Sequence, residues 1–143
     1  RTDEGNVLEK DFTTRVENIK TLLDKVIEID PERIESVRAR LEKGISELKE
    51  KIDENRFEPE LVYYIEKFDI TEEKVRLQNH LDYFIEALNT SESNGKKLGF
   101  IAQEMGREIN TIGSKSNFAP MQKLVVQMKD ELEKIKEQLL NVL

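Results

Sequence analysis

Two rows of polar side chains run along residues 103–116 at intervals of three and four. One row is Gln103, Arg107, Asn110 and Ser114, and the other is Glu104, Glu108, Thr111 and Lys115. Because residues three and four apart share one face of an α-helix, the spacing predicts a helix with a polar face. A solvated helix face consists mainly of Glu, Lys and Arg, whereas this one adds amide and hydroxyl groups. That mixture is typical of a binding or catalytic site.

Cleavage of a phosphodiester bond is one reaction that these groups could support. Glu104 and Glu108 are one helical turn apart, so both carboxylates could bind one divalent cation such as Mn²⁺ or Mg²⁺. Arg107 and Lys115 flank them and could hold phosphate oxygens, the arginine in bidentate fashion. The ordinary alternative is a solvated row of ion pairs, and the spacing alone favours that alternative.

A second polar row, Glu73, Arg76 and His80, has the same helical spacing. Imidazole transfers protons readily near neutral pH, and His80 is the only histidine of the chain. It could be a general acid or base, a metal ligand, or a hydrogen-bonded surface group. If the two helices pack side by side in antiparallel fashion, this row can face the one that holds Glu104 and Glu108.

Several of the polar residues also have a structural interpretation. Asn110, Thr111 and Ser114 can end a helix through side-chain bonds to the backbone, which is the commoner role of such residues. Glu73 can complement the positive end of a helix that starts near Thr71. The sequence contains no cysteine, and no nucleotide-binding glycine loop or zinc-protease motif. Thiolate chemistry and those two site types are therefore excluded.

Apolar residues at intervals of three and four predict the helices that position these rows. The first two apolar seams are Leu8, Phe12, Val16, Ile19, Leu23 and Val26, and Ile34, Val37, Leu41, Ile45, Leu48 and Ile52. Between them, Asp30 followed by Pro31 is typical of a helix N-cap and first helical residue. The pattern predicts two long helices joined as a hairpin, followed by a break at residues 55–59.

The rest of the chain predicts four shorter helices, which brings the total to about six. Their apolar positions lie within residues 61–68, 70–88, 98–112 and 121–142. The chain has only six Gly and three Pro, which are few turn-forming residues for a β-fold. We therefore predict an all-α fold, with a long protruding helical hairpin arm at residues 1–54 and a compact helical bundle at residues 58–143.

Charge limits the partners that the surface can bind. The formal net charge is −7, which argues against a general nucleic-acid clamp, because phosphate binding depends on clustered Lys and Arg. On the same ground, DNA is not an expected partner. No apolar run is long enough to span a membrane, so a membrane is not an expected partner either. The chain starts at Arg1 rather than Met, and we expect it to be a piece of a longer protein.

The same polar segments resemble the C-terminal part of the YicC family of bacterial proteins, described as stress-induced and as endoribonucleases. The matching motifs are Gln103-Glu104, Arg107-Glu108, Asn110-Thr111, Gly113-Ser114-Lys115-Ser116, the upstream segment Asp69-Ile70-Thr71-Glu72-Glu73, Arg76-Leu77 and His80-Leu81, and downstream Lys129, Glu133, Glu137-Gln138 and Asn141. The resemblance covers most of the chain, and residues 103–116 are its most specific part. The family pattern is not matched at Gly99, Gly106, Lys136 and Leu143.

The resemblance implies a cytoplasmic, divalent-metal-dependent endoribonuclease that cleaves single-stranded RNA. It implies an additional N-terminal domain, so residues 1–143 alone are expected to fold but to be weak or inactive as a nuclease. The implied roles can be given by residue. They are catalysis for His80, Glu104, Arg107 and Glu108, metal binding for Glu73, Glu104 and Glu108, and phosphate binding for Arg76, Arg107, Asn110, Ser114 and Lys115. The alternative is a non-catalytic helical adaptor module for RNA turnover or stress response.

The arm carries an additional prediction about assembly. Two long seams in one hairpin expose more apolar edge than they can bury on each other. We therefore expect a homo-oligomer of closed symmetry, with a hexamer as the candidate assembly.

Overall fold

The chain folds into α-helices joined by short turns in the parts that the computed structural model describes, which are residues 3–47, 54–90 and 95–142. The helices are α1 (Asp3–Glu47), α2 (Glu54–Lys67), α3 (Thr71–Asn89), α4 (Gly95–Lys115) and α5 (Ala119–Leu139). The prediction of an all-α fold is confirmed. The described residues contain five helices rather than about six, because the first two predicted helices are one.

Helix α1 continues through Pro31, so the prediction of a hairpin turn at this point is wrong. Proline removes a helical hydrogen bond and usually kinks or ends a helix. Asp30, however, is not an N-cap. Its carboxylate lies 2.8 Å from Nε of Arg33, one turn further along the same helix, and both residues are buried. The carboxylate of Asp30 is thus used by a side chain within the helix rather than by the backbone of a helix start.

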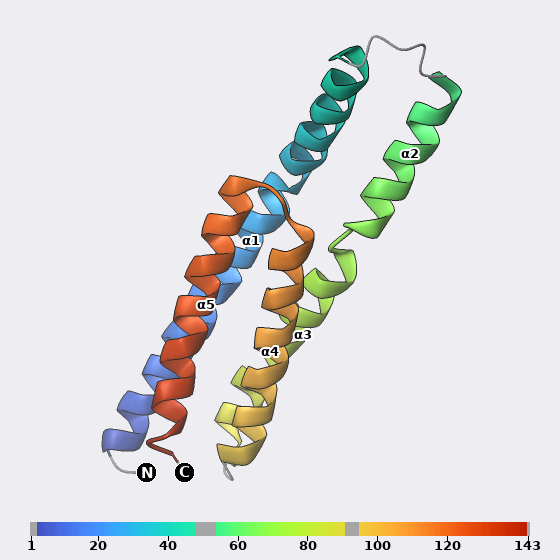
Figure 1. Ribbon diagram of the computed structural model, residues 1–143. Helices are drawn as coiled ribbons and strands as arrows, with labels where there is room; N and C mark the ends of the chain where they lie inside the picture. Colours follow the sequence, from blue (N-terminus) through green and yellow to red (C-terminus); the bar gives the residue numbers. More distant parts are fainter. Residues whose placement is uncertain (1–2, 48–53, 91–94, 143) are drawn as a thin grey trace.

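Helices α1, α3, α4 and α5 form a bundle in which neighbouring helices run antiparallel (Figure 1). Helix α4 packs between α3 and α5. Helix α1 also packs against α3 and α5, on the side that faces away from α4. The predicted apolar seams form its core, whose buried members include Phe12, Val16, Ile19, Leu23 and Val26 of α1, Leu77, Leu81 and Phe84 of α3, and Leu98, Ile101, Met105, Ile109 and Ile112 of α4. The first half of α1 is thus part of the bundle and not of an arm.

The second half of α1 and helix α2 extend together beyond the turn between α4 and α5 (Figure 1). Val37 of α1 and Leu61 of α2 are buried here, whereas Val62 and Tyr63 are exposed. Helix α2 already includes residues 55–59, so the predicted break at this position is wrong.

The arm therefore combines the second half of the predicted hairpin with α2, whereas the first half of that hairpin belongs to the bundle. Leu48 and Ile52 of the second predicted seam lie outside the described residues. Within the described ranges, no helix is both long enough and apolar enough to cross a membrane.

Two glycines allow α4 and α5 to approach closely. A Cβ atom on Gly113 would lie 3.0 Å from Cγ1 of Val125, and one on Gly106 would lie 3.1 Å from Cδ2 of Leu132. Both distances are shorter than an ordinary van der Waals contact. A side chain at either position would therefore need its neighbour on α5 to move by a few tenths of an ångström at this spacing of the helices.

The end of α4 is held by Gln122 of α5. Its Nε2 donates hydrogen bonds to the carbonyl oxygens of Gly113, at 2.7 Å, and of Ser116. Carbonyl groups in the last turn of a helix have no partner within the helix, so this side chain supplies one. The contact fixes the turn of α4 that carries Lys115.

Candidate active site

The antiparallel packing of α3 and α4 brings the two predicted polar rows together at Arg76 and Glu108. Nε of Arg76 lies 3.1 Å from Oε1 of Glu108. The glutamate side chain is 7% exposed, whereas that of Arg76 is 49% exposed, so a buried carboxylate meets a cation at the surface. The hydrogen bond to Glu108, together with its charge, raises the pKa of the Arg76 guanidinium, which stays positively charged.

A second buried carboxylate, Glu73 of α3, joins this pair to the end of α4. Its Oε1 accepts a hydrogen bond from Nζ of Lys115 at 2.8 Å and lies 3.8 Å from Nη2 of Arg76. Its Oε2 is buried and has no hydrogen-bond partner within the described part of the chain. We call Glu73, Arg76, Glu108 and Lys115 the α3–α4 cluster.

Side chains of helix α1 contact the end of α4 and the start of α3 beside the α3–α4 cluster. Nη1 of Arg33 donates to the carbonyl oxygen of Lys115 at 3.2 Å, and Asp30 lies 2.8 Å from Arg33 and 3.9 Å from Nζ of Lys74. Lys115 also donates from Nζ to the carbonyl oxygen of Asp69 at 3.0 Å. These contacts accompany the uninterrupted helix α1 at Pro31.

Sequence reasoning missed the role of Asp30 and Arg33. The available signal was an acid and a base three residues apart on a helix face that is otherwise apolar. The proline that follows Asp30 favoured a cap instead. Lys115 was predicted to hold phosphate, and its ion pair with Glu73 was not predicted.

His80 lies one turn beyond Arg76 on the same face of α3 and is half-buried. Glu104, one turn before Glu108 on α4, is half-buried too. The described contacts include no ion pair between these two residues and the α3–α4 cluster. Their catalytic roles stay predictions, although both lie on the helix faces that the cluster occupies.

The other predicted phosphate ligands lie on the outer side of α4. Arg107, Asn110 and Ser114 are exposed. The hydroxyl of Ser114 donates to the carbonyl oxygen of Thr111 at 3.0 Å, and that of Thr111 donates to the carbonyl oxygen of Arg107 at 3.0 Å. Both hydroxyl groups thus bond to the backbone of α4, which is the commoner role of such residues. Phosphate binding by Asn110 and Ser114 stays a prediction.

Two of the three predicted metal ligands, Glu73 and Glu108, are paired with cationic side chains. Among the described residues, no group of three or more His, Cys, Asp or Glu side chains is placed to hold a metal ion. Glu73 and Glu108 face Lys115 and Arg76, whose positive charges occupy the position that a cation would take. In this conformation a divalent ion at Glu73 or Glu108 would have to displace these cations, and metal binding by Glu73, Glu104 and Glu108 stays a prediction.

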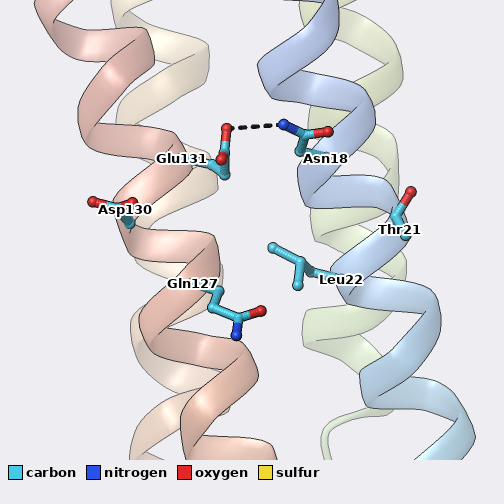
Figure 2. A pocket seen from close by; sticks show the side chains of 6 residues that line it. All are labelled: Asn18, Thr21, Leu22, Gln127, Asp130 and Glu131. Atoms are coloured by element: carbon cyan, nitrogen blue, oxygen red, sulfur yellow. Dashed lines mark hydrogen bonds between the residues drawn. The ribbon is translucent and has the colours of Figure 1, made fainter.

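A second polar seam lies between α1 and α5. A groove in this seam has a volume of about 320 Å³. It is lined by Asn18, Thr21, Leu22, Gln127, Asp130 and Glu131 (Figure 2). Oε2 of Glu131 accepts hydrogen bonds from Asn18 at 3.3 Å and from Arg15 at 3.4 Å, and Oε1 lies 3.6 Å from Nζ of Lys134. The glutamate side chain is 15% exposed.

Comparison with known proteins agrees with the resemblance seen in the motifs. Residues 11–143 match the model of a family described as endoribonuclease YicC-like, C-terminal. The chain is 39% identical over 145 residues to the probable endoribonuclease YicC of Clostridioides difficile (strain 630), an alignment that covers 99% of this chain and 50% of that protein. It is 32% identical over 139 residues to the probable endoribonuclease YicC of Haemophilus influenzae, which covers 97% of this chain and 48% of the relative. The chain thus spans about half the length of the curated relatives it matches.

Proposed function

Because this chain belongs to the YicC-like endoribonuclease family, we propose that it is the helical part of an endoribonuclease that cleaves single-stranded RNA at the α3–α4 cluster. The observation that supports the location is the 3.1 Å contact between Arg76 and Glu108. It joins the polar row of α3 to the polar row of α4, which holds the most specific part of the family motif, in one cluster at the protein surface.

The α3–α4 cluster supplies charge relief for a phosphodiester. The guanidinium of Arg76 is half-exposed and is held by Glu108, so it can present its remaining N–H groups to phosphate oxygens with little loss of side-chain freedom. Lys115 is 29% exposed and sits on the other side of Glu73. Arg107 is exposed one residue before Glu108. In this proposal Glu108 and Glu73 are positioning residues, which orient the cations that contact RNA.

His80 is the proton-transfer group of the proposal. It lies four residues after Arg76 on α3, so a phosphate bound by Arg76 would place a reacting oxygen near the imidazole. As a base, the imidazole of His80 would take a proton from the attacking oxygen. As an acid, its protonated form would give a proton to the leaving oxygen. In either role the second proton is exchanged with water, which supplies it to the leaving oxygen or accepts it from the attacking oxygen.

The first experiment asks whether the whole protein cuts RNA. Labelled single-stranded RNA is incubated with the full-length protein, with Mn²⁺, with Mg²⁺ and with chelator, and the products are separated on a denaturing gel. We expect internal cleavage, and its loss with chelator would support the predicted metal dependence. Intact RNA under every condition, with a protein that is folded by circular dichroism, would refute the nuclease proposal.

An adaptor function is the second candidate, and one observation favours it. Both buried carboxylates of the α3–α4 cluster are neutralised by a cation, which is also the arrangement of a purely structural ion-pair network. Glu108→Ala separates the two functions. Loss of RNA cleavage with an unchanged mass by light scattering supports catalysis, whereas loss of assembly together with activity supports the adaptor.

A further inference from the structure

Two aromatic rings are exposed at the end of the α3–α4 pair that lies away from Lys115. Tyr83 of α3 is 43% exposed and Phe100 of α4 is 70% exposed. Lys97 precedes Phe100 by three residues, and its Nζ lies 4.9 Å from the centre of the Tyr83 ring. These three side chains share one surface, and we call them the aromatic corner.

The core of the bundle does not account for the aromatic corner. Helix α4 already buries a complete apolar stripe, from Leu98 to Ile112, against its neighbours. A single exposed apolar side chain needs no explanation. Here, however, a ring and a cation are in contact, and a second exposed ring, Phe100, follows that cation by three residues on the same helix.

The aromatic corner lies on the same face as the α3–α4 cluster. Phe100 precedes Glu104 by four residues and Arg107 by seven, so it continues the polar face of α4 by one turn. Along the helix axis, Phe100 and Arg107 are about 10 Å apart. On α3, Tyr83 follows His80 by three residues. A strand held at the cluster and directed toward the start of α4 would therefore reach both rings.

The charge of the aromatic corner suits a polyanion. Lys96 and Lys97 occupy the first turn of α4, which contains no acidic residue, although the whole chain has a net charge of −7. Aromatic rings beside a cation form the usual surface for single-stranded nucleic acid, in which bases stack on the rings while the cation meets a phosphate. Few other ligands combine flat apolar faces with repeated negative charge.

We propose that Tyr83 and Phe100 stack against bases of single-stranded RNA whose backbone lies on the α3–α4 cluster, with Lys97 beside a phosphate. This inference rests on the proposed function, because it assigns a base-binding subsite to the same RNA. Stacking involves the ring faces that all four bases share, so the subsite holds RNA without selecting a sequence.

The test compares an oligouridine with an abasic oligonucleotide of equal length, so that stacking is separated from phosphate binding. Affinities of the full-length protein are measured by fluorescence anisotropy. We expect Phe100→Ala to weaken oligouridine binding on the order of tenfold and to leave abasic binding unchanged. Phe100→Trp should retain the affinity, which shows that the ring and not the fold is responsible.

Tyr63→Ala is the matched control, because Tyr63 is 62% exposed on the arm and should not affect either oligonucleotide. Equal loss on both oligonucleotides, or no loss for Phe100→Ala in a protein that binds and cuts RNA, overturns the subsite while the proposed function stands. A protein that binds no RNA overturns both. Loss of assembly mass in Phe100→Ala with normal RNA affinity would make this surface a contact between copies instead, and would also overturn the subsite.

Discussion

Glu108 and Glu131 both lie between two antiparallel helices, but their surroundings differ. Glu131, between α1 and α5, has contacts from Asn18, Arg15 and Lys134, which serve both of its oxygens. Glu108, between α3 and α4, is more buried and is paired with the half-exposed Arg76. The first arrangement satisfies a carboxylate, whereas the second uses a carboxylate to hold a cation at the surface.

Among the residues that the structure describes, each of the two seams also contains one buried polar atom without a hydrogen-bond partner, and the two atoms differ in chemical type. In the α1–α5 seam it is Nε of Arg15, one of five donors of a guanidinium that has other contacts. In the α3–α4 cluster it is Oε2 of Glu73, one of two oxygens of a carboxylate. An unpaired carboxylate oxygen is costly in a buried position, and such costs are concentrated at functional sites.

The comparison predicts the largest loss of stability where α1 supports the α3–α4 cluster. Asp30→Ala leaves Arg33 buried without its carboxylate, and we expect a loss of about 3–5 kcal/mol in the free energy of unfolding. Glu131→Ala should cost no more than about 1 kcal/mol, because its partners are partly solvated. Urea unfolding followed by circular dichroism measures both. Equal losses would remove the distinction between the two regions.

Two glycines of α4 should respond in opposite directions to the same substitution. Gly113→Ala places a methyl group against the buried Val125, and we expect a loss of about 1–2 kcal/mol from overpacking. Gly99→Ala meets no atom within 4 Å and should gain about 0.5–1 kcal/mol through helix propensity. The melting temperatures of the two variants, compared with that of the unmodified protein, show whether the two changes in stability have opposite signs. A stabilised Gly113→Ala would mean that α4 and α5 are not tightly fixed.

The smallest expected effect concerns an exposed ion pair between α1 and α3. The hydrogen bond from Lys20, at 2.8 Å, lowers the pKa of Asp82 and raises that of Lys20. The stabilisation is therefore present above the ordinary Asp pKa of 3.8 and is lost as the pH falls through the lowered value. It is also lost at high pH, as Lys20 deprotonates above its ordinary value of 10.5.

Asp82→Asn should remove this pH dependence, with a change below about 1 kcal/mol because the pair is exposed and screened by salt. Melting temperatures of both proteins at pH 3 and pH 7 give the comparison. A larger loss in Asp82→Asn than in Asp30→Ala would reverse the ranking of buried and exposed charges.

Apolar spacing was sufficient to predict the elements that carry the site. The stripe of Leu98, Ile101, Met105, Ile109 and Ile112 is buried as the intervals of three and four required. The same spacing placed the polar rows of α3 and α4 on faces that meet at Arg76 and Glu108. These features depend only on helical periodicity and on two neighbouring helices that pack antiparallel.

Features that depend on distant residues could not be predicted. The contacts of Asp30 with Lys74 of α3 and of Arg33 with the end of α4 accompany the uninterrupted helix at Pro31, and neither could be read from the local sequence. Likewise, Lys115 reaches Glu73 across the bundle end, and no local pattern marks that pair. Local sequence patterns indicate the secondary structure that a segment prefers. The burial of a charged group depends instead on which helices pack against it.

We propose that the α3–α4 cluster, and not the α1–α5 seam, cleaves RNA. The most direct test is the single-turnover rate constant for cleavage of labelled single-stranded RNA by the full-length protein and by Glu108→Gln and Glu131→Gln, with RNA affinity and melting temperature measured alongside. We predict that Glu108→Gln slows cleavage on the order of 100-fold with similar RNA affinity, and that Glu131→Gln cuts RNA at the normal rate. Normal cleavage by a folded Glu108→Gln, or equal losses in the two variants, would contradict the account.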